Sequence, residues 1–163
     1  SATIGRIDDL RLGESILLGR EPLGRTAIDG LHTDCFTVVA EVIEAKVKPT
    51  RPWGEIQQTA FGAAEPRRDP GSTGRVIVAL GRQDTDPDGL EPPPGYGIIG
   101  ASSDHLVLDA GTVLPAVGTE LPFQLGYGAL VRAMTSPFVA KVFSGAVPTA
   151  STGSAALTAL AGG

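Results

Sequence analysis

Glycine and proline divide this chain into short apolar runs. The 163 residues include 22 glycines and 13 prolines, whereas aromatic residues make up only 5% of the chain. Both residue types interrupt helices and favour the turns that join short strands. Because 42% of the residues are hydrophobic, the runs between the turns are sufficient for a buried core. The sequence therefore predicts a mainly β protein rather than a helix bundle.

The apolar runs predict about six to eight short strands, at a spacing typical of a small barrel or sandwich. The strongest is residues 35–46, CFTVVAEVIEAK, which is rich in Val, Thr and Ile. Residues 10–19, LRLGESILLG, predict a strand buried on both faces near its end, because three large aliphatic residues follow one another. Further strands are expected in residues 74–80, 98–99, 106–108, 117–125 and 135–143, and a short helix in residues 127–134.

Charge and cysteine content limit the partners and the compartment. A net charge of −5 argues against nucleic acid or an anionic membrane as the main partner. No run approaches the roughly 18–20 apolar residues that span a bilayer, and the first residues lack the order of a signal peptide. The single cysteine, Cys35, excludes an internal disulfide. We therefore expect a cytoplasmic protein.

A polar group separates two apolar runs in residues 96–109, YGIIGASSDHLVLD. It consists of Ser102, Ser103, Asp104 and His105. Polar side chains need hydrogen-bond partners when they are buried between strands. One interpretation is a turn held by side-chain to backbone hydrogen bonds. The other is a loop whose free N–H groups receive a substrate carboxylate while Asp104 fixes the turn. A hydrolytic triad within adjacent residues is excluded, since its members must converge from separate segments.

Other reactive residue types each have two interpretations. Cys35 is either a small core residue or a thiolate activated by His32, which lies three residues earlier. Ser1 is either a processing remnant or an N-terminal nucleophile, which would make the chain the β subunit of a self-cleaved amidohydrolase. Because His32 and His105 lie far apart, no His/Cys cluster has the spacing of a metal site.

An arginine lies within the apolar run of residues 10–18. Arg11 either pairs with Asp8 or Asp9 at a strand end, or donates hydrogen bonds to a ring nitrogen or an anion. Gly13 either forms a bulge or allows the backbone to approach a ligand closely. Composition alone favours the structural role for Arg11.

Five blocks of sequence resemble the alanine racemase-like family, and most closely its ornithine racemase-type branch. They are LRLGESILLGRE (10–21), FTVVAEVIE (36–44), ALGRQD (79–84), GASSDHLVLD (100–109) and YGALVRAMTSPFV (127–139). The blocks occur in the family's order and cover most of residues 10–143. They correspond only to the C-terminal part of the family.

The resemblance implies a particular architecture. Family members bind pyridoxal 5'-phosphate, have an N-terminal (β/α)8 barrel followed by a C-terminal β domain, and generally act as head-to-tail dimers. Residues 1–21 then hold the last barrel strand and a segment that contacts the cofactor, residues 22–143 form the β domain, and residues 144–163 form a flexible Ala/Gly/Ser/Thr tail. The cofactor lysine would lie on a missing barrel portion, a separate chain or a cleaved fragment, so this chain alone is expected to be inactive. A non-catalytic binding or assembly module is the remaining alternative.

The resemblance also implies roles for individual residues. Arg11 matches the arginine that faces the pyridine nitrogen. Gly13 and Glu14 match positions whose backbone N–H groups meet the cofactor phosphate. Ser103 and Asp104 match the loop that reaches the partner's active site and holds the substrate carboxylate.

One departure from the family pattern concerns the second acid/base. Where alanine racemases carry a tyrosine in a GYAD block, this chain has Arg82. An arginine keeps its proton and is a poor acid/base. His105, Cys35 and Tyr127 are the candidates for that role, and Arg82 is expected instead to bind the polar end of a longer amino-acid substrate. The predicted reaction is removal of the α-proton and its return on the opposite face.

Overall fold

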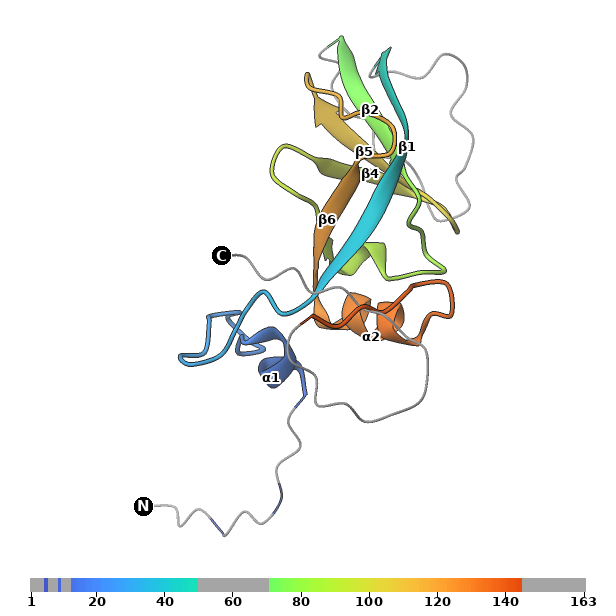
Figure 1. The fold of residues 1–163 in the computed structure, drawn as a ribbon. Coiled ribbons are helices and arrows are strands. Elements are labelled where there is room, and N and C mark those ends of the chain that lie inside the picture. The colour runs from blue at the N-terminus through green and yellow to red at the C-terminus, as the bar shows by residue number, and fades with distance from the viewer. Residues whose placement is uncertain (1–4, 6–8, 10–12, 50–70, 145–163) are drawn as a thin grey trace. The chain divides into compact units, whose positions relative to one another are not determined.

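A computed structural model describes residues 5, 9, 13–49 and 71–144. The chain divides into two compact units, residues 1–35 and residues 36–163, which are described separately below (Figure 1). The predicted division at residues 21 and 143 stays a prediction. Arg11, Ser1 and nearly all of the expected tail lie outside the described residues.

The first unit contains one short helix, α1 (Glu14–Leu18), followed by an irregular loop. Arg25 pairs with Glu14 of the helix. The carboxylate of Glu21 accepts a hydrogen bond from the N–H of Leu23 at 2.9 Å, and it also accepts from the Gly24 N–H. These bonds, that of Leu23 foremost, lower the pKa of Glu21. The loop is therefore organised around two acidic side chains.

The strand predicted for residues 10–19 is wrong over its second half, because Glu14–Leu18 is helical. Ile16 and Leu17 are exposed and only Leu18 is buried, so the run does not have two buried faces. Glu and Leu are good helix formers. Gly19 then ends the helix with φ +63°, a conformation that glycine adopts without strain. Residues 10–12 lie outside the described residues.

The second unit is a curled, half-barrel sheet of six antiparallel strands, followed by a helix (Figure 1). The strands are β1 (Thr37–Pro49), β2 (Ser72–Val78), β3 (Leu90–Glu91), β4 (Gly97–Ala101), β5 (Leu106–Gly111) and β6 (Glu120–Leu125). They lie in the order β3-β6-β1-β2-β5-β4. A 3-10 turn, η1 (Pro87–Gly89), precedes β3, and α2 (Tyr127–Thr135) follows β6. The mainly β class and the helix after residue 126 are confirmed.

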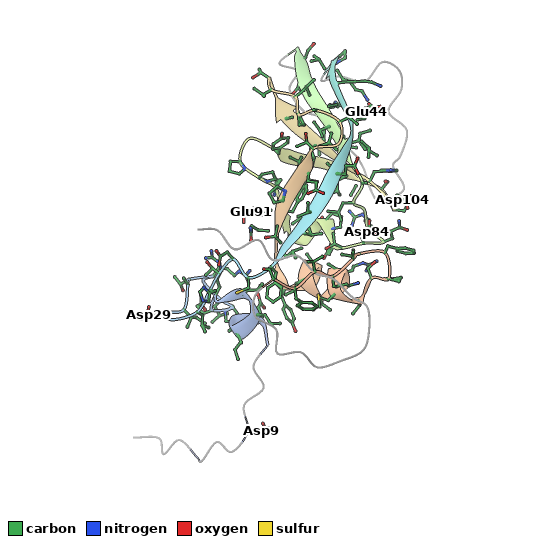
Figure 2. All side chains as sticks on the ribbon, viewed as in Figure 1. Asp9, Asp29, Glu44, Asp84, Glu91 and Asp104 are labelled. Atoms are coloured by element: carbon green, nitrogen blue, oxygen red, sulfur yellow. The ribbon has the colours of Figure 1, made fainter. Side chains whose placement is uncertain are left out.

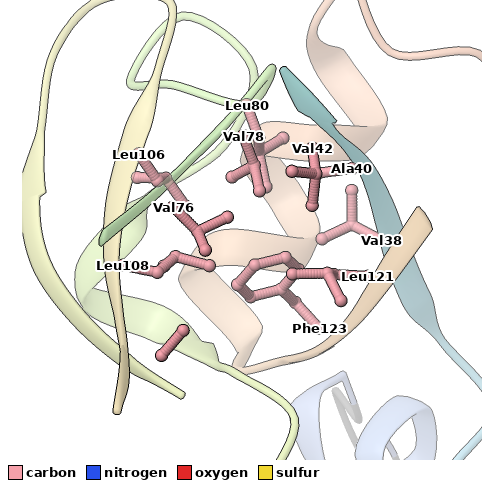
Figure 3. Close-up of a cluster of buried hydrophobic side chains, with 11 residues drawn as sticks. Val38, Ala40, Val42, Val76, Val78, Leu80, Leu106, Leu108, Leu121 and Phe123 are labelled. Atoms are coloured by element: carbon pink, nitrogen blue, oxygen red, sulfur yellow. The ribbon is translucent and has the colours of Figure 1, made fainter. Parts of the chain in front are cut away.

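The core lies inside the curl of the sheet, where four strands place alternate residues (Figure 3). Its members are Val38, Ala40, Val42, Val76, Val78, Leu80, Leu106, Leu108, Ala110, Leu121 and Phe123. Phe123 is the largest of the fully buried side chains. The strands predicted in residues 35–46, 74–80 and 106–108 from their apolar composition supply most of this core through alternate residues.

A β-bulge changes the face of β1 at its midpoint. Val42 lies opposite Val78 and Glu44 lies opposite Ile77, so Ile43 is one residue more than β2 can match. Even-numbered residues face the core before the bulge, whereas Ala45 packs against the core after it. As a result Glu44 lies on the outer face, where Lys48 and Lys46 donate to it at 2.7 and 3.1 Å. These hydrogen bonds, that of Lys48 foremost, lower the pKa of Glu44.

The strand predicted for residues 135–143 is also wrong. Thr135 ends α2, and residues 136–144 form no strand. The segment FVAKVF has strand-forming residues, but no strand of the described sheet pairs with it. In the described part of the chain, no helix has both the length and the apolar composition needed to cross a membrane.

Candidate functional site

Two loops that lie about 20 residues apart in the sequence are joined at one end of the sheet. The N–H of Arg82 donates to the carbonyl of Ser102 at 2.9 Å, and the N–H of Gln83 donates to the carbonyl of Ser103 at 3.0 Å. The first loop follows β2, and the second is the turn between β4 and β5. The structure thus brings together the backbones of two segments predicted to bind substrate.

Gly81 allows this close approach. It is buried, and an added Cβ would lie 2.2 Å from the carbonyl oxygen of Ser103 and 2.5 Å from the nitrogen of Asp104. Both are backbone atoms, which cannot move aside as a side chain can. Glycine is therefore required here by the space between the loops rather than by its backbone angles.

The β4–β5 turn is held by Ser102, as the first interpretation of the sequence predicted. The Ser102 N–H donates to the His105 carbonyl at 2.8 Å, and the His105 N–H donates to Ser102 Oγ at 3.0 Å. Ser103 Oγ donates to Asp104 Oδ2 at 2.7 Å. Ser102, Ser103, Asp104 and His105 are all exposed. The turn is therefore rigid at its base, and it presents a hydroxyl, a carboxylate and an imidazole to the outside.

Asp84 organises the Arg82 loop from within. Its Oδ2 atom accepts a hydrogen bond from the N–H of Gly81 at 2.8 Å, and the residue is only 8% exposed. Figure 2 shows Asp84 and Asp104 in this part of the unit, away from Glu44. Because its carboxylate is turned to the loop's own backbone, Asp84 holds Gly81 in place against the turn.

Removing this carboxylate should loosen the loop. We expect Asp84→Ala to lower the free energy of unfolding of the second unit by about 1–3 kcal/mol, because the Gly81 N–H loses its buried acceptor. Asp84→Asn should lower it less, since the amide oxygen can still accept. Urea unfolding measures both values. Asp88→Ala removes a carboxylate from an exposed position of the same loop and is the control. Equal effects of Asp84→Ala and Asp88→Ala would contradict this role.

Helix α2 supports the same loop from the other side. Arg132 Nε donates to the carbonyl of Arg82 at 3.0 Å, and Ser136 Oγ donates to the carbonyl of Gln83 at 3.1 Å. Thr85 Oγ1, which is fully buried, donates to the carbonyl of Ala129 at 2.9 Å. Nothing in the sequence pattern indicates these donors, because their acceptors are carbonyls 44–53 residues away in the chain.

The Arg82 side chain lies at the surface of this region. Its Nη1 atom is 4.0 Å from Asp88 Oδ2, and the two side chains are 31% and 83% exposed. An exposed pair at this distance contributes little to stability, about 0–1 kcal/mol. The contact with Asp88 therefore does little to hold the guanidinium in place.

The three candidates for the second acid/base lie in different places. His105 is in the β4–β5 turn, and Tyr127 is the first residue of α2 and is 38% exposed. Tyr127 lines a shallow depression with Asp86, Gly128, Val131, Arg132 and Thr135. Cys35 is exposed and belongs to the first unit. In the described part of the second unit, no hydrogen bond joins His105 to Tyr127. Their roles stay predictions.

The residues predicted to meet a phosphate lie at the start of α1. Gly13 is the residue before the helix, and no side chain caps the first helical N–H groups. Glu14 places a carboxylate in this first turn, where Arg25 pairs with it. Within the described ranges, no three His, Cys, Asp or Glu side chains form a group that could hold a metal ion.

Comparison with known proteins relates the chain to two amino-acid racemases. It is 42% identical over 138 residues to the ornithine racemase of Acetoanaerobium sticklandii, a match that covers 83% of this chain and 39% of the relative. It is 45% identical over 141 residues to the lysine racemase of Thermotoga maritima, a match that covers 84% of this chain and 39% of the relative. No protein-family profile and no solved structure matches. The chain is therefore similar to these racemases over its own length, and it spans about two fifths of theirs.

Proposed function

We propose that this chain is the C-terminal portion of a pyridoxal-phosphate-dependent amino-acid racemase, and that a (β/α)8 barrel portion carries the cofactor lysine. The observation that carries the proposal is the pair of hydrogen bonds that join the Arg82 loop to the Ser102–Ser103 turn. The resemblance assigns the turn to substrate binding, and the departure from the family pattern at Arg82 predicts a substrate-binding role for the loop. Their meeting in space supports one site built from both.

Two features at the start of α1 support binding of the cofactor phosphate. Uncapped N–H groups at the start of α1 are the kind of donors that bind a phosphate, and Arg25 offsets the nearby charge of Glu14. We propose that Gly13 and Glu14 hold the phosphate through their backbone N–H groups, and that Arg11 faces the pyridine nitrogen. The bound cofactor would acidify the α-proton of the substrate amino acid.

The lysines of this chain do not suit the covalent attachment of the cofactor. They are Lys46, Lys48 and Lys141. Lys46 and Lys48 pair with Glu44 on the outer face of the sheet, and Lys141 donates to the carbonyl of Ser136. This supports the proposal that the catalytic lysine lies on the barrel portion, and that the chain is inactive without it.

In this proposal the second unit binds the substrate and supplies one acid/base. Ser103 and Asp104 position the substrate carboxylate in the partner subunit's active site, so the working enzyme is a homodimer. The lysine of the barrel portion serves one face of the α-carbon, and His105, Cys35 or Tyr127 serves the other. A cytoplasmic location belongs to the same proposal and is supported by the lone Cys35, which can form no internal disulfide.

The relatives' names indicate the substrate class. Ornithine and lysine both carry a second amino group at the end of an aliphatic side chain, and we propose such a diamino acid as the substrate. Arg82 would not bind that ammonium directly because both groups are cations. Its position beside the Ser102–Ser103 turn instead supports binding of the substrate carboxylate, together with Ser103.

A fused enzyme tests this function. In this fusion, the part of the A. sticklandii ornithine racemase that does not match this chain is joined to this chain. The two parts follow one another in the order that they have in the relative. With pyridoxal 5'-phosphate added, we expect it to racemise L-ornithine or L-lysine, measured by loss of optical rotation. The same fusion with the cofactor lysine replaced by alanine is the inactive control. A folded, cofactor-loaded fusion that racemises neither amino acid would contradict the proposal.

A further inference from the structure

In the described part of the chain, the first half of β1 pairs with a strand along one edge only. Residues 37–41 of this strand pair with β6, whereas pairing with β2 begins only at Val42. The N–H of Val42 donates to Thr119 on the β6 side, and the carbonyl of Glu41 accepts from Ala79 on the other side. Because backbone groups alternate along a strand, those of Thr37 and Val39 point to the β2 side, where no described strand pairs with them.

This edge borders an apolar groove with a volume of about 420 Å³. It is lined by the first half of β1, by the loop that follows β2, and by residues of β6, α2 and 138–142. Most lining side chains are hydrophobic, including the buried Leu80 and Leu130 and the exposed Met134 and Phe138. The groove therefore offers backbone hydrogen-bonding groups and apolar surface together, which is what an added strand requires.

The charges of the groove are all of one sign. Glu41 lies directly opposite Glu120 on the neighbouring strand, and Asp84 lies in the loop that follows β2. The residues that line the groove include these three carboxylates and no lysine, arginine or histidine. Like charges directly opposite one another in a sheet are destabilising. A lysine or arginine of a bound segment would relieve the repulsion between Glu41 and Glu120.

We propose that an extended polypeptide segment, in which apolar residues alternate with a lysine or arginine, adds to the sheet as a strand along Thr37 and Val39. Its apolar side chains fill the groove and its cation lies between Glu41 and Glu120. The segment comes from the three fifths of the relatives' length that this chain does not cover, so the inference rests on the proposed function. Two observations favour this occupant: the groove carries only acidic side chains, which a cationic segment would complement, and about three fifths of the relatives' length lies outside the match to this chain.

Amide hydrogen exchange in the fused enzyme tests the docking. The N–H groups of Thr37 and Val39 should exchange at least roughly 100-fold more slowly than the N–H of Gly95, an exposed turn residue. The double variant Glu41→Lys/Glu120→Lys should speed the exchange of Val39 at least tenfold. Glu91→Lys reverses an exposed charge of β3 outside the groove. It should therefore leave the exchange rate of the Val39 N–H within twofold of the rate in the unsubstituted fusion. Unprotected Thr37 and Val39, or unchanged protection in the double variant, would overturn the proposal.

A photo-crosslinking residue in place of Val39 identifies the occupant. The expected adduct is a peptide from the ornithine racemase part of the fusion that contains a lysine or arginine between apolar residues. An adduct with a second copy of the whole fusion, or no adduct with the ornithine racemase part, would overturn the choice of occupant. Racemase activity is read separately. If the fusion is active but the N–H groups of Thr37 and Val39 are unprotected, only the docking proposal is wrong. If these N–H groups are protected but the fusion is inactive, only the proposed function is wrong.

Discussion

Phe123→Ala is expected to lower the free energy of unfolding of the second unit by about 3–5 kcal/mol. Phe123 is 0% exposed, and it is the largest side chain in the cluster that fills the curl of the sheet. It lies on β6, which pairs with both β1 and β3. Its loss would leave a cavity among side chains from several strands, and strands paired on both sides cannot easily move inward to close it.

Chemical denaturation followed by circular dichroism measures this loss. Phe143→Ala is the matched control, because it removes the same side chain from a position that is 60% exposed. It should change the free energy of unfolding by about 0.5 kcal/mol or less. If both variants unfolded at the same denaturant concentration, the cluster around Phe123 would not be the core that stabilises this unit.

Gly81→Ala should separate the two loops of the candidate site. The added methyl group would lie 2.2 Å from the Ser103 carbonyl oxygen, so one of the two backbones must move. We expect the free energy of unfolding to fall by about 1–3 kcal/mol, as in other overpacked sites. Racemase activity of the fused enzyme should fall at least roughly 100-fold, because misplacing binding groups by about 1 Å has effects of that size.

Hydrogen exchange distinguishes local separation from global unfolding. In Gly81→Ala, the N–H groups of Arg82 and Gln83 should exchange faster, because they donate across the two loops. The N–H groups of β2 and β5 should keep their protection. Gly97→Ala is the control, since an added Cβ there meets no atom within 4 Å. Retained protection at Arg82 together with full activity would show that the junction has no functional role.

The sheet was predictable where strand-forming residues are concentrated between turns. β1, β2 and β5 are rich in Val, Ile or Leu, and this local composition was sufficient to identify them. Residues 14–18 were misassigned because a short apolar run fits a strand or a helix equally well. The segment 138–143 has strand-forming residues, but a strand also needs a partner, and local sequence does not contain that information.

The polar turn of residues 102–105 was predictable from its own residues as one of two alternatives, whereas Arg82 entered the candidate site only through resemblance to other sequences. The loops of Arg82 and Ser103 lie far apart in the chain, so neither composition nor spacing indicated that they meet. The inward direction of Asp84 was missed for a related reason. Its acceptor role depends on the fold of the loop around Gly81, which the local sequence pattern does not indicate.

The bulge at Ile43 sets which side chains of β1 face the core. If β1 alternated regularly through Ile43, the side chains of Glu44, Lys46 and Lys48 would turn toward the interior and Ala45 would turn outward. A one-residue deletion beyond the bulge would likewise reverse the faces of the residues after it, whereas an insertion in a surface turn has no such effect. Because of the bulge, the first half of β1 borders the apolar groove, and its second half carries the ion pairs of Glu44 with Lys46 and Lys48. Protein engineers who shorten or splice this chain should therefore keep the residue count of β1 unchanged and make their joins elsewhere.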